Sequence, residues 1–136
     1  MPPPSSKPGG VFLYIHGGGY ILAHCGWFGD TLNAIAKVTN LTVISPEYRL
    51  ASRRPLFPCG PEDVCDVAEY LIDNSVSTYC GPLKFVAGES AGSTLSMFII
   101  LYLLVARPKF SFQGSRSCAG CSTGVFRQAR VIGPRC

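Results

Sequence analysis

Short apolar runs alternate along the chain with longer stretches in which apolar residues recur every three or four positions. Three of the runs are almost continuously apolar, and they predict strands near 11–16, 42–46 and 83–88. Each run is four to six residues long and is bounded by polar or glycine-rich segments, which is typical of strands that are buried on both faces.

Helical periodicity fills the segments between and after these runs. Asp30 is a candidate N-cap for a first helix. Pro61, followed by two acidic residues, predicts the start of a second helix, because proline is tolerated at a first helical position and acids favour the positive end of the helix dipole. The segment 91–106 is strongly apolar and predicts a third helix. The apolar stripe of the second helix consists of Val64, Val67, Ala68, Leu71 and Ile72.

The order strand–helix–strand–helix–strand–helix predicts an α/β fold, with a parallel sheet as its core and helices flanking it. The periodic pattern ends at about residue 107. We therefore expect a flexible leader over 1–10, a folded unit over 11–106 and a basic, irregular tail over 107–136. Within the tail, only 128–132 is a candidate for a short strand.

The composition is that of a single globular domain. The chain has 136 residues, of which 47% are hydrophobic and 15% charged, and this balance separates it from disordered chains. The net charge of +4 is too small to indicate nucleic acid as a partner. The charge is uneven, because 1–106 carries six basic and eight acidic residues, whereas 107–136 carries six basic and no acidic ones.

The longest apolar stretch, 95–106, is shorter than a bilayer requires, so we expect no transmembrane segment. Membrane association through 91–106 and the basic tail is an alternative that the sequence does not favour, because such a helix is normally buried against the sheet.

Seven cysteines form an odd set without a repeating spacing, which argues against a closed disulfide framework. The first ten residues have no apolar stretch of the kind found in secretory signals. Free thiols and a cytoplasmic location are therefore expected. Cys118 and Cys121 have the spacing of half a zinc site, but no second pair and no nearby histidine accompany them, so we expect neither a metal nor a cofactor.

The segment Gly88-Glu89-Ser90-Ala91-Gly92 matches the pattern G-x-S-x-G. In this pattern a serine on a sharp strand-to-helix turn projects its hydroxyl above the sheet edge, and the small residues on either side let the backbone pass closely. The other interpretation is an ordinary glycine-rich turn that opens a helix. The predicted strand before the motif and the predicted helix after it favour the nucleophile elbow.

A second glycine-rich segment, His16-Gly17-Gly18-Gly19, follows the first predicted strand. Consecutive glycines allow backbone N–H groups to point at one spot and to hold the negative charge of a tetrahedral intermediate. A flexible loop or a phosphate-binding turn are the alternatives. The phosphate-binding turn requires a helix start, and the residues that follow, 20–22, do not have that character.

Four motifs, in this order and spacing, resemble the N-terminal half of the hormone-sensitive-lipase-like α/β-hydrolases, also called the alpha/beta hydrolase fold-3 family. The resemblance covers roughly 11–106. It implies an α/β-hydrolase fold and hydrolysis of small, uncharged, apolar carboxylic esters through an acyl-enzyme. The motifs are His16–Tyr20, Pro46–Ala51, Pro58 with Asp63 five positions later, and Gly88–Gly92.

The resemblance also implies a role for each motif residue. Ser90 would be the nucleophile, and the backbone N–H groups of Gly17, Gly18 and Ala91 would bind the oxyanion. Tyr20 would lie near the acyl or alcohol pocket. The pair of Arg49 and Asp63 would form a structural ion pair or cap. The motif residues expected to be structural are His16, Gly19, Tyr20, Arg49, Asp63, Gly88 and Gly92. The sequence departs from the family at 52–54, where a locally altered loop is expected.

The catalytic acid and histidine of such a fold follow the nucleophile along the chain. Residues 91–136 contain no Asp, Glu or His, and both histidines, His16 and His24, precede Ser90. A serine hydroxyl is a weak nucleophile without an adjacent base. Two hypotheses follow: a serine esterase or lipase-like hydrolase, as the motifs indicate, or a catalytically inactive, truncated fragment or pseudoenzyme that acts by binding or as a decoy.

In the complete fold of this family the strand at 83–87 lies in the middle of the sheet. Nothing in the sequence after it predicts a convincing neighbour for its outer edge. An uncovered apolar edge strand is a template for aggregation. We therefore expect self-association through this edge, poor solubility and exposed apolar surface.

Overall fold

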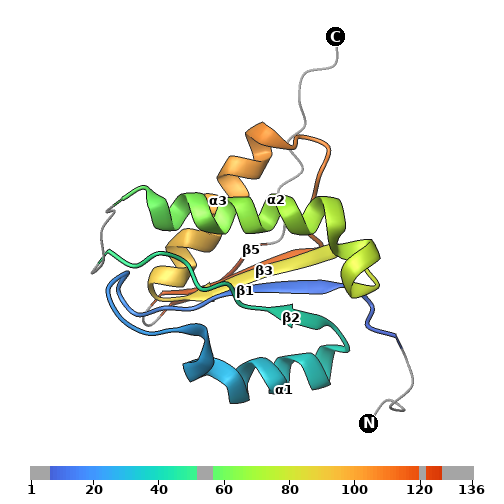
Figure 1. Ribbon diagram of the computed structural model, residues 1–136, viewed down its shortest axis with the longest axis horizontal. Helices are drawn as coiled ribbons and strands as arrows, with labels where there is room; N and C mark the ends of the chain where they lie inside the picture. Colours follow the sequence, from blue (N-terminus) through green and yellow to red (C-terminus); the bar gives the residue numbers. More distant parts are fainter. Residues whose placement is uncertain (1–6, 52–56, 120–121, 127–136) are drawn as a thin grey trace.

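The computed structural model describes residues 7–51, 57–119 and 122–126, and this part of the chain forms one sheet with helices on both faces (Figure 1). The sheet has five strands in the order β2-β1-β3-β4-β5. The strands are β1 (Val11–Ile15), β2 (Thr42–Ile44), β3 (Leu83–Glu89), β4 (Gly114–Ala119) and β5 (Ser122–Phe126). The helices are the short 3-10 helix η1 (Cys25–Phe28), α1 (Gly29–Thr39), α2 (Cys59–Tyr79) and α3 (Ala91–Ala106).

The three strands expected from the apolar runs are present, and they are parallel. β1 lies between β2 and β3, with Val11 opposite Thr42 and Ile15 opposite Gly88. The predicted parallel core with flanking helices is therefore confirmed. Because β1 and β3 end at the same edge of the sheet, the two glycine-rich motifs that follow them begin side by side.

Two helices cover one face of the sheet and one helix covers the other. The side chains of β1 alternate, so that Leu13 and Ile15 join the buried cluster formed with α2 and α3, while Tyr14 contacts Phe28 at the start of α1. Helices α2 and α3 lie together on one side of the sheet, and α1 lies on the other (Figure 1). Members of the core from these elements are Val11, Leu13, Ile15, Val64, Ala68, Leu71, Val86, Leu95, Ile99 and Leu103.

The outer edge of β3 is paired, which corrects the expectation of an uncovered edge. β4 runs parallel to β3, with Phe85 opposite Gly114 and Glu89 opposite Cys118, and β5 pairs with β4 in the antiparallel sense. Strands β4 and β5 lie in the segment for which the sequence predicts no regular structure. Their sequence has neither an apolar run nor a period of two, and the pairing rests on backbone hydrogen bonds that leave no sequence signal. The candidate strand at 128–132 and the altered loop at 52–54 lie outside the described residues.

The starts of two helices differ from the sequence predictions. The N-cap of α1 is Phe28, so the prediction of Asp30 as the cap is wrong, although Asp30 lies in the first turn, where its charge favours the helix dipole. Helix α2 begins at Cys59, two residues before the proline expected to start it. Pro61 fits there because the N–H groups of the first helical turn have no intrahelical partners.

The end of α3 is tied to α2 by a small network of charges. The guanidinium of Arg107 donates to Asp73 at 2.8 Å and to Glu69 at 3.3 Å. The hydroxyl of Tyr102 donates to Glu69 at 2.9 Å. These contacts link the end of α3 to α2.

The face of α3 that points away from the sheet is apolar and exposed. Val105 is 84% exposed, and Leu101 is 56% exposed. Apolar side chains therefore remain accessible on α3 even though the neighbouring strand edge is covered. Among the described helices, none combines the length and the apolar character that crossing a membrane requires.

Removal of buried apolar volume from α3 should lower the free energy of unfolding. We expect Ile99→Ala to cost about 2–5 kcal/mol, because Ile99 is fully buried between the helix and the sheet. The matched control, Val105→Ala on the exposed face of the same helix, should change the value by about 0.5 kcal/mol or less. Urea unfolding followed by circular dichroism measures both, and equal losses for the two variants would contradict the packing described here.

Candidate active site

The turn between β3 and α3 consists of one residue, Ser90. Its φ of 49° and ψ of −121° lie outside the regions that residues with a side chain normally adopt. The side chain is exposed at the edge of the sheet. Ser90 therefore forms a strained and exposed one-residue turn between a strand and a helix, which we call the elbow.

The glycines on either side of Ser90 lie where no side chain fits. A Cβ on Gly92 would overlap the carbonyl oxygen of Ile15, at the end of β1. A Cβ on Gly88 would overlap the carbonyl oxygen of Gly92. The first turn of α3 therefore lies directly against the backbone of the sheet, and this close approach is what both glycines permit.

Residues 17–19, which follow β1 and His16, form a glycine loop that lies against the elbow. A Cβ on Gly17 would be 3.0 Å from the carbonyl oxygen of Glu89 and 3.3 Å from the Cβ of Ser90. Gly18 and Gly19 follow with φ values of 110° and 62°, which favour glycine. The structure thus brings Gly17 next to Ser90, as the parallel arrangement of β1 and β3 predicts.

His16 is fully buried at the start of this loop and contacts the loop rather than Ser90. Its Nδ1–H donates to the carbonyl oxygen of Gly17 at 2.8 Å. Its ring stacks on Tyr48 with a centroid separation of 4.4 Å, and its Nε2 is 3.8 Å from Oε1 of Glu47.

Two residues after β2 that sequence reasoning assigned no role, Glu47 and Tyr48, contact this region. Tyr48 donates its hydroxyl to the carbonyl oxygen of His16 at 2.8 Å. Glu47 accepts the N–H of Cys25 at 2.9 Å through Oε2. Burial works to raise the pKa of Glu47, but the hydrogen bonds from Cys25 and the nearby imidazoles of His16 and His24 outweigh it and lower the pKa. The signal for these two residues in the sequence was their place in the motif Pro46–Ala51, which begins two positions after the end of β2.

Arg49 and Asp63, expected as a structural pair, are in direct contact. The Nη2 of Arg49 donates to Oδ1 of Asp63 at 2.6 Å, and the Nε and the backbone N–H of Arg49 donate to Oδ2 at 2.9 and 2.8 Å. The hydrogen bonds from Arg49 lower the pKa of Asp63 below its ordinary value of 3.8, against the opposing effect of burial. The pair fastens the segment after β2 to the first turns of α2.

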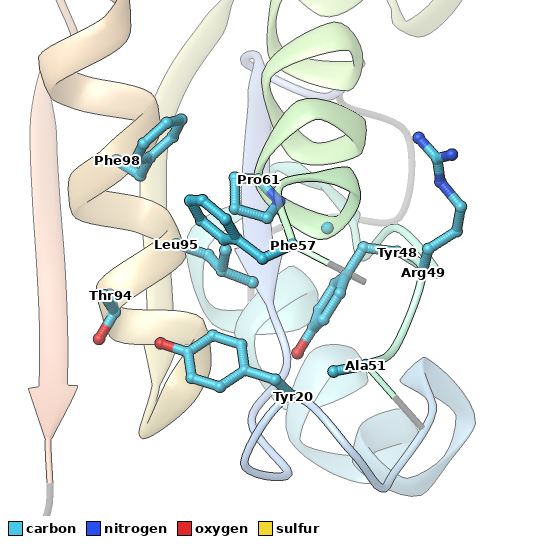
Figure 2. A pocket seen from close by; sticks show the side chains of 10 residues that line it. Tyr20, Tyr48, Arg49, Ala51, Phe57, Pro61, Thr94, Leu95 and Phe98 are labelled. Atoms are coloured by element: carbon cyan, nitrogen blue, oxygen red, sulfur yellow. The ribbon is translucent and has the colours of Figure 1, made fainter. Parts of the chain in front are cut away.

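A pocket of about 320 Å³ opens beside the first turns of α3 (Figure 2). Tyr20, which has a φ of 65°, lines it, and its ring lies between Tyr48 and Thr94 with the hydroxyl directed toward α3 (Figure 2). Thr94 is one helical turn after Ser90, so the pocket adjoins the elbow. Its walls are mainly apolar and aromatic, from Tyr20, Tyr48, Ala51, Phe57, Pro61, Leu95 and Phe98.

Candidate metal ligands are dispersed. Within residues 7–51, 57–119 and 122–126, no group of three or more His, Cys, Asp or Glu side chains is arranged to hold a metal ion. Cys121 lies outside the described residues. His24 accepts the N–H of Gly26 at 3.1 Å through Nδ1, at the start of η1, and its ring contacts Trp27.

Comparison with known proteins gives a consistent family. A sequence profile described as alpha/beta hydrolase fold matches residues 12–120. Esterase LipI of Mycobacterium tuberculosis is 31% identical over 98 residues, which cover 71% of this chain and 30% of that protein. An acetyl esterase of Salmonella schwarzengrund is 30% identical over 103 residues, which cover 75% of this chain and 31% of the relative.

Solved structures agree with the sequence relatives. The monoclinic form of an esterase from Pyrobaculum calidifontis matches with a TM-score of 0.73 and 26% identity, over 83% of this chain and 36% of that chain. The chain therefore spans about a third of the length of the proteins that it matches.

The bond between Arg49 and Asp63 should make folding stability depend on pH in acid. Because the pKa of Asp63 is lowered on folding, its contribution is complete above the ordinary carboxyl value of 3.8 and is lost as the pH falls through the folded value. We expect Asp63→Asn to be less stable than the parent at pH 6, and the difference to shrink as the pH approaches 3. Urea unfolding at several pH values measures this.

The matched control is Asp66→Asn, which changes an exposed carboxylate on the same helix that makes no ion pair within the described part of the chain. A pH-independent difference between Asp63→Asn and the parent would contradict the assignment, as would an equal effect of Asp66→Asn.

Proposed function

Because the chain belongs to the alpha/beta hydrolase family, we propose that it carries the nucleophile and the oxyanion-binding part of a carboxylic ester hydrolase. The observation that carries the proposal is the placement of Ser90. It is exposed and held at positive φ between β3 and α3, with the backbone of Gly17 packed against it.

The proposed chemistry begins with attack of the Ser90 Oγ on the carbonyl carbon of an ester. The carbonyl oxygen becomes an oxyanion, which accepts hydrogen bonds from the N–H groups of Gly17, Gly18 and Ala91. Ala91 is the first residue of α3, so the positive end of the helix dipole adds to the stabilisation. Collapse of the intermediate releases the alcohol and leaves an acyl group on Ser90, which water then removes.

The proton of Ser90 requires a base, and in this family the base is a histidine that follows the nucleophile. Residues 91–136 have no histidine and no carboxylate. His16 is bound to the glycine loop, and His24 is bound at the start of η1. We propose that the 136-residue polypeptide on its own binds an ester but turns it over negligibly.

The pocket beside Ser90 supports an apolar ester as the ligand. Its walls are mainly hydrocarbon and aromatic rings, and Tyr20 and Thr94 add hydroxyl groups near the elbow. Such a site suits an uncharged acyl or alcohol group whose polar ester faces Ser90. The esterases among the relatives are consistent with this ligand class.

Exogenous imidazole offers a test that separates the nucleophile from the missing base. A serine-directed phosphonate should not label the polypeptide in plain buffer, and Ser90→Ala should leave the background hydrolysis of a short-chain aryl ester unchanged. With imidazole present, labelling of Ser90 should accelerate, because a general base contributes about 10²–10⁴-fold and a free imidazole supplies part of it. Mass spectrometry of the labelled peptide measures the rate.

Ser77→Ala, which removes an exposed serine on α2, is the matched control and should label like the parent. Absence of Ser90 labelling at every imidazole concentration would overturn the nucleophile assignment. Rapid labelling or turnover without imidazole, abolished by Ser90→Ala, would overturn the proposal that the polypeptide lacks a base.

Substitution in the pocket should weaken binding of an apolar ester. Phe98→Ala removes an aromatic wall that is 43% exposed, and we expect the affinity to fall about five- to tenfold, equivalent to about 1–1.4 kcal/mol of lost apolar contact. Isothermal titration calorimetry with a neutral short-chain ester measures this. Val105→Ala, farther along the same helix and away from the pocket, should bind like the parent, and equal losses for the two variants would contradict the site.

A further inference from the structure

Side-chain donors hold the carbonyl groups of His16 and Gly17, at the start of the glycine loop. Tyr48 donates its hydroxyl to the carbonyl oxygen of His16 at 2.8 Å and lies 3.4 Å from that of Gly17. The Nδ1–H of His16 also donates to the carbonyl oxygen of Gly17, at 2.8 Å. Two consecutive carbonyl groups are therefore fixed by a buried phenol and a buried imidazole.

Each of these carbonyl groups shares a peptide unit with a candidate oxyanion donor. The carbonyl of His16 is in the same unit as the N–H of Gly17, and the carbonyl of Gly17 is in the same unit as the N–H of Gly18. Both units are trans. A trans peptide unit is planar, with C=O and N–H pointing in opposite directions. Carbonyls turned toward Tyr48 thus require both N–H groups to point away from it.

We propose that Tyr48 is a positioning residue for the oxyanion donors: its hydroxyl holds the carbonyl groups of His16 and Gly17, and thereby sets the directions of the N–H groups of Gly17 and Gly18. The assignment of these N–H groups as oxyanion donors rests on the proposed function. The orientation imposed by Tyr48 does not, because it follows from hydrogen bonds within the protein.

The hydroxyl is separable from the packing role of the ring. Tyr48 is 2% exposed, and its ring stacks on His16 at an interplanar angle of 18°. A phenylalanine would preserve that stacking and remove only the donor. Backbone hydrogen bonds from Ile21 and Leu22 hold the carbonyl group of Gly18, but this group shares its peptide unit with the N–H of Gly19. The preceding glycines have wide conformational freedom and no side chains that pack. The directions of the N–H groups of Gly17 and Gly18 therefore depend on the side-chain donors of Tyr48 and His16.

Tyr48 is in turn fixed by its two neighbours in the chain. Glu47 accepts the N–H of Cys25, and Arg49 is bound to Asp63 on α2. Burial, reinforced by the nearby Tyr20 and Glu47, raises the pKa of Tyr48 to about 12. The phenol consequently keeps its proton and remains a donor throughout the pH range of ordinary assays.

Tyr48→Phe tests the proposal through the orientation of individual N–H bonds. Residual dipolar couplings of the ¹⁵N-labelled protein report these directions without any substrate. We expect the couplings of Gly17 and Gly18 to shift by more than the spread of changes across β1 and β3, whose amides should keep their values. Tyr70→Phe, which removes a hydroxyl from a half-exposed tyrosine on α2, is the matched control and should leave Gly17 and Gly18 unchanged.

Unchanged couplings of Gly17 and Gly18 in Tyr48→Phe would overturn the proposal, as would an equal change in Tyr70→Phe. Failure of Ser90 to be labelled in imidazole would overturn the proposed function and leave this result intact, so the two outcomes are distinguishable.

The parent protein supplies a second test that does not depend on the folding of a variant. The hydroxyl proton of Tyr48 should exchange slowly with water, because the hydroxyl is buried and donates to the carbonyl oxygen of His16, and slow exchange supports the proposal. Exchange at the rate of a free phenol would overturn it.

Discussion

The arrangement depends on the contact between the first turn of α3 and the carboxyl end of β1. Gly92 lies against the backbone carbonyl of Ile15, where a single methyl group would overlap it. This contact sets how far α3 stands from the sheet, and it forces the chain to turn within the single residue Ser90. The positive φ of Ser90 is thus a consequence of packing. A residue in this conformation costs about 1–3 kcal/mol of stability, and the packing of the surrounding backbone holds Ser90 in it.

Residues 47–49, which we call the clamp after β2, contact three different elements. Glu47 binds the first residue of η1, Tyr48 binds the glycine loop, and Arg49 binds Asp63 in α2. Three consecutive residues thus hold three different elements. Arg49 and Asp63 are both accessible to solvent, so their pair contributes more to the position of this segment than to the overall free energy of unfolding.

Much of the fold was predictable because its signals are local. The runs that became β1, β2 and β3, and the apolar helix α3, are visible in the order of residues alone. The elbow and the glycine loop were identifiable for the same reason, since each needs glycine at fixed positions. Strands β4 and β5 were missed because their pairing uses backbone groups, which every residue has. Both helix starts were misplaced by two residues because Asp30 and Pro61 fit several positions of a first turn equally well.

The contacts of Tyr48 could not be predicted from spacing. Thirty-two positions separate it from His16, and the two meet only because β1 and β2 are parallel neighbours whose carboxyl ends share one sheet edge. The same topology brings Gly17 to Ser90 through β3. A parallel sheet therefore brings the segments that follow its strands to one edge, and a residue that contacts a loop can follow a strand far away in sequence.

Stabilisation of charge and transfer of a proton are separate tasks in the proposed reaction, and they have different structural requirements. Oriented N–H groups need only a rigid backbone, which β1, β3, α3 and the clamp after β2 supply within the described residues. A base needs a side chain at hydrogen-bond distance from the Ser90 Oγ, held in one tautomer by a further group. In serine proteases, removal of triad members leaves about 10³–10⁴-fold catalysis from the oxyanion hole and binding alone, which shows that the two tasks are separable in energy as well. In the reaction that we propose, the region around Ser90 performs the first task, and the glycines and Tyr48 keep its backbone groups at a fixed orientation.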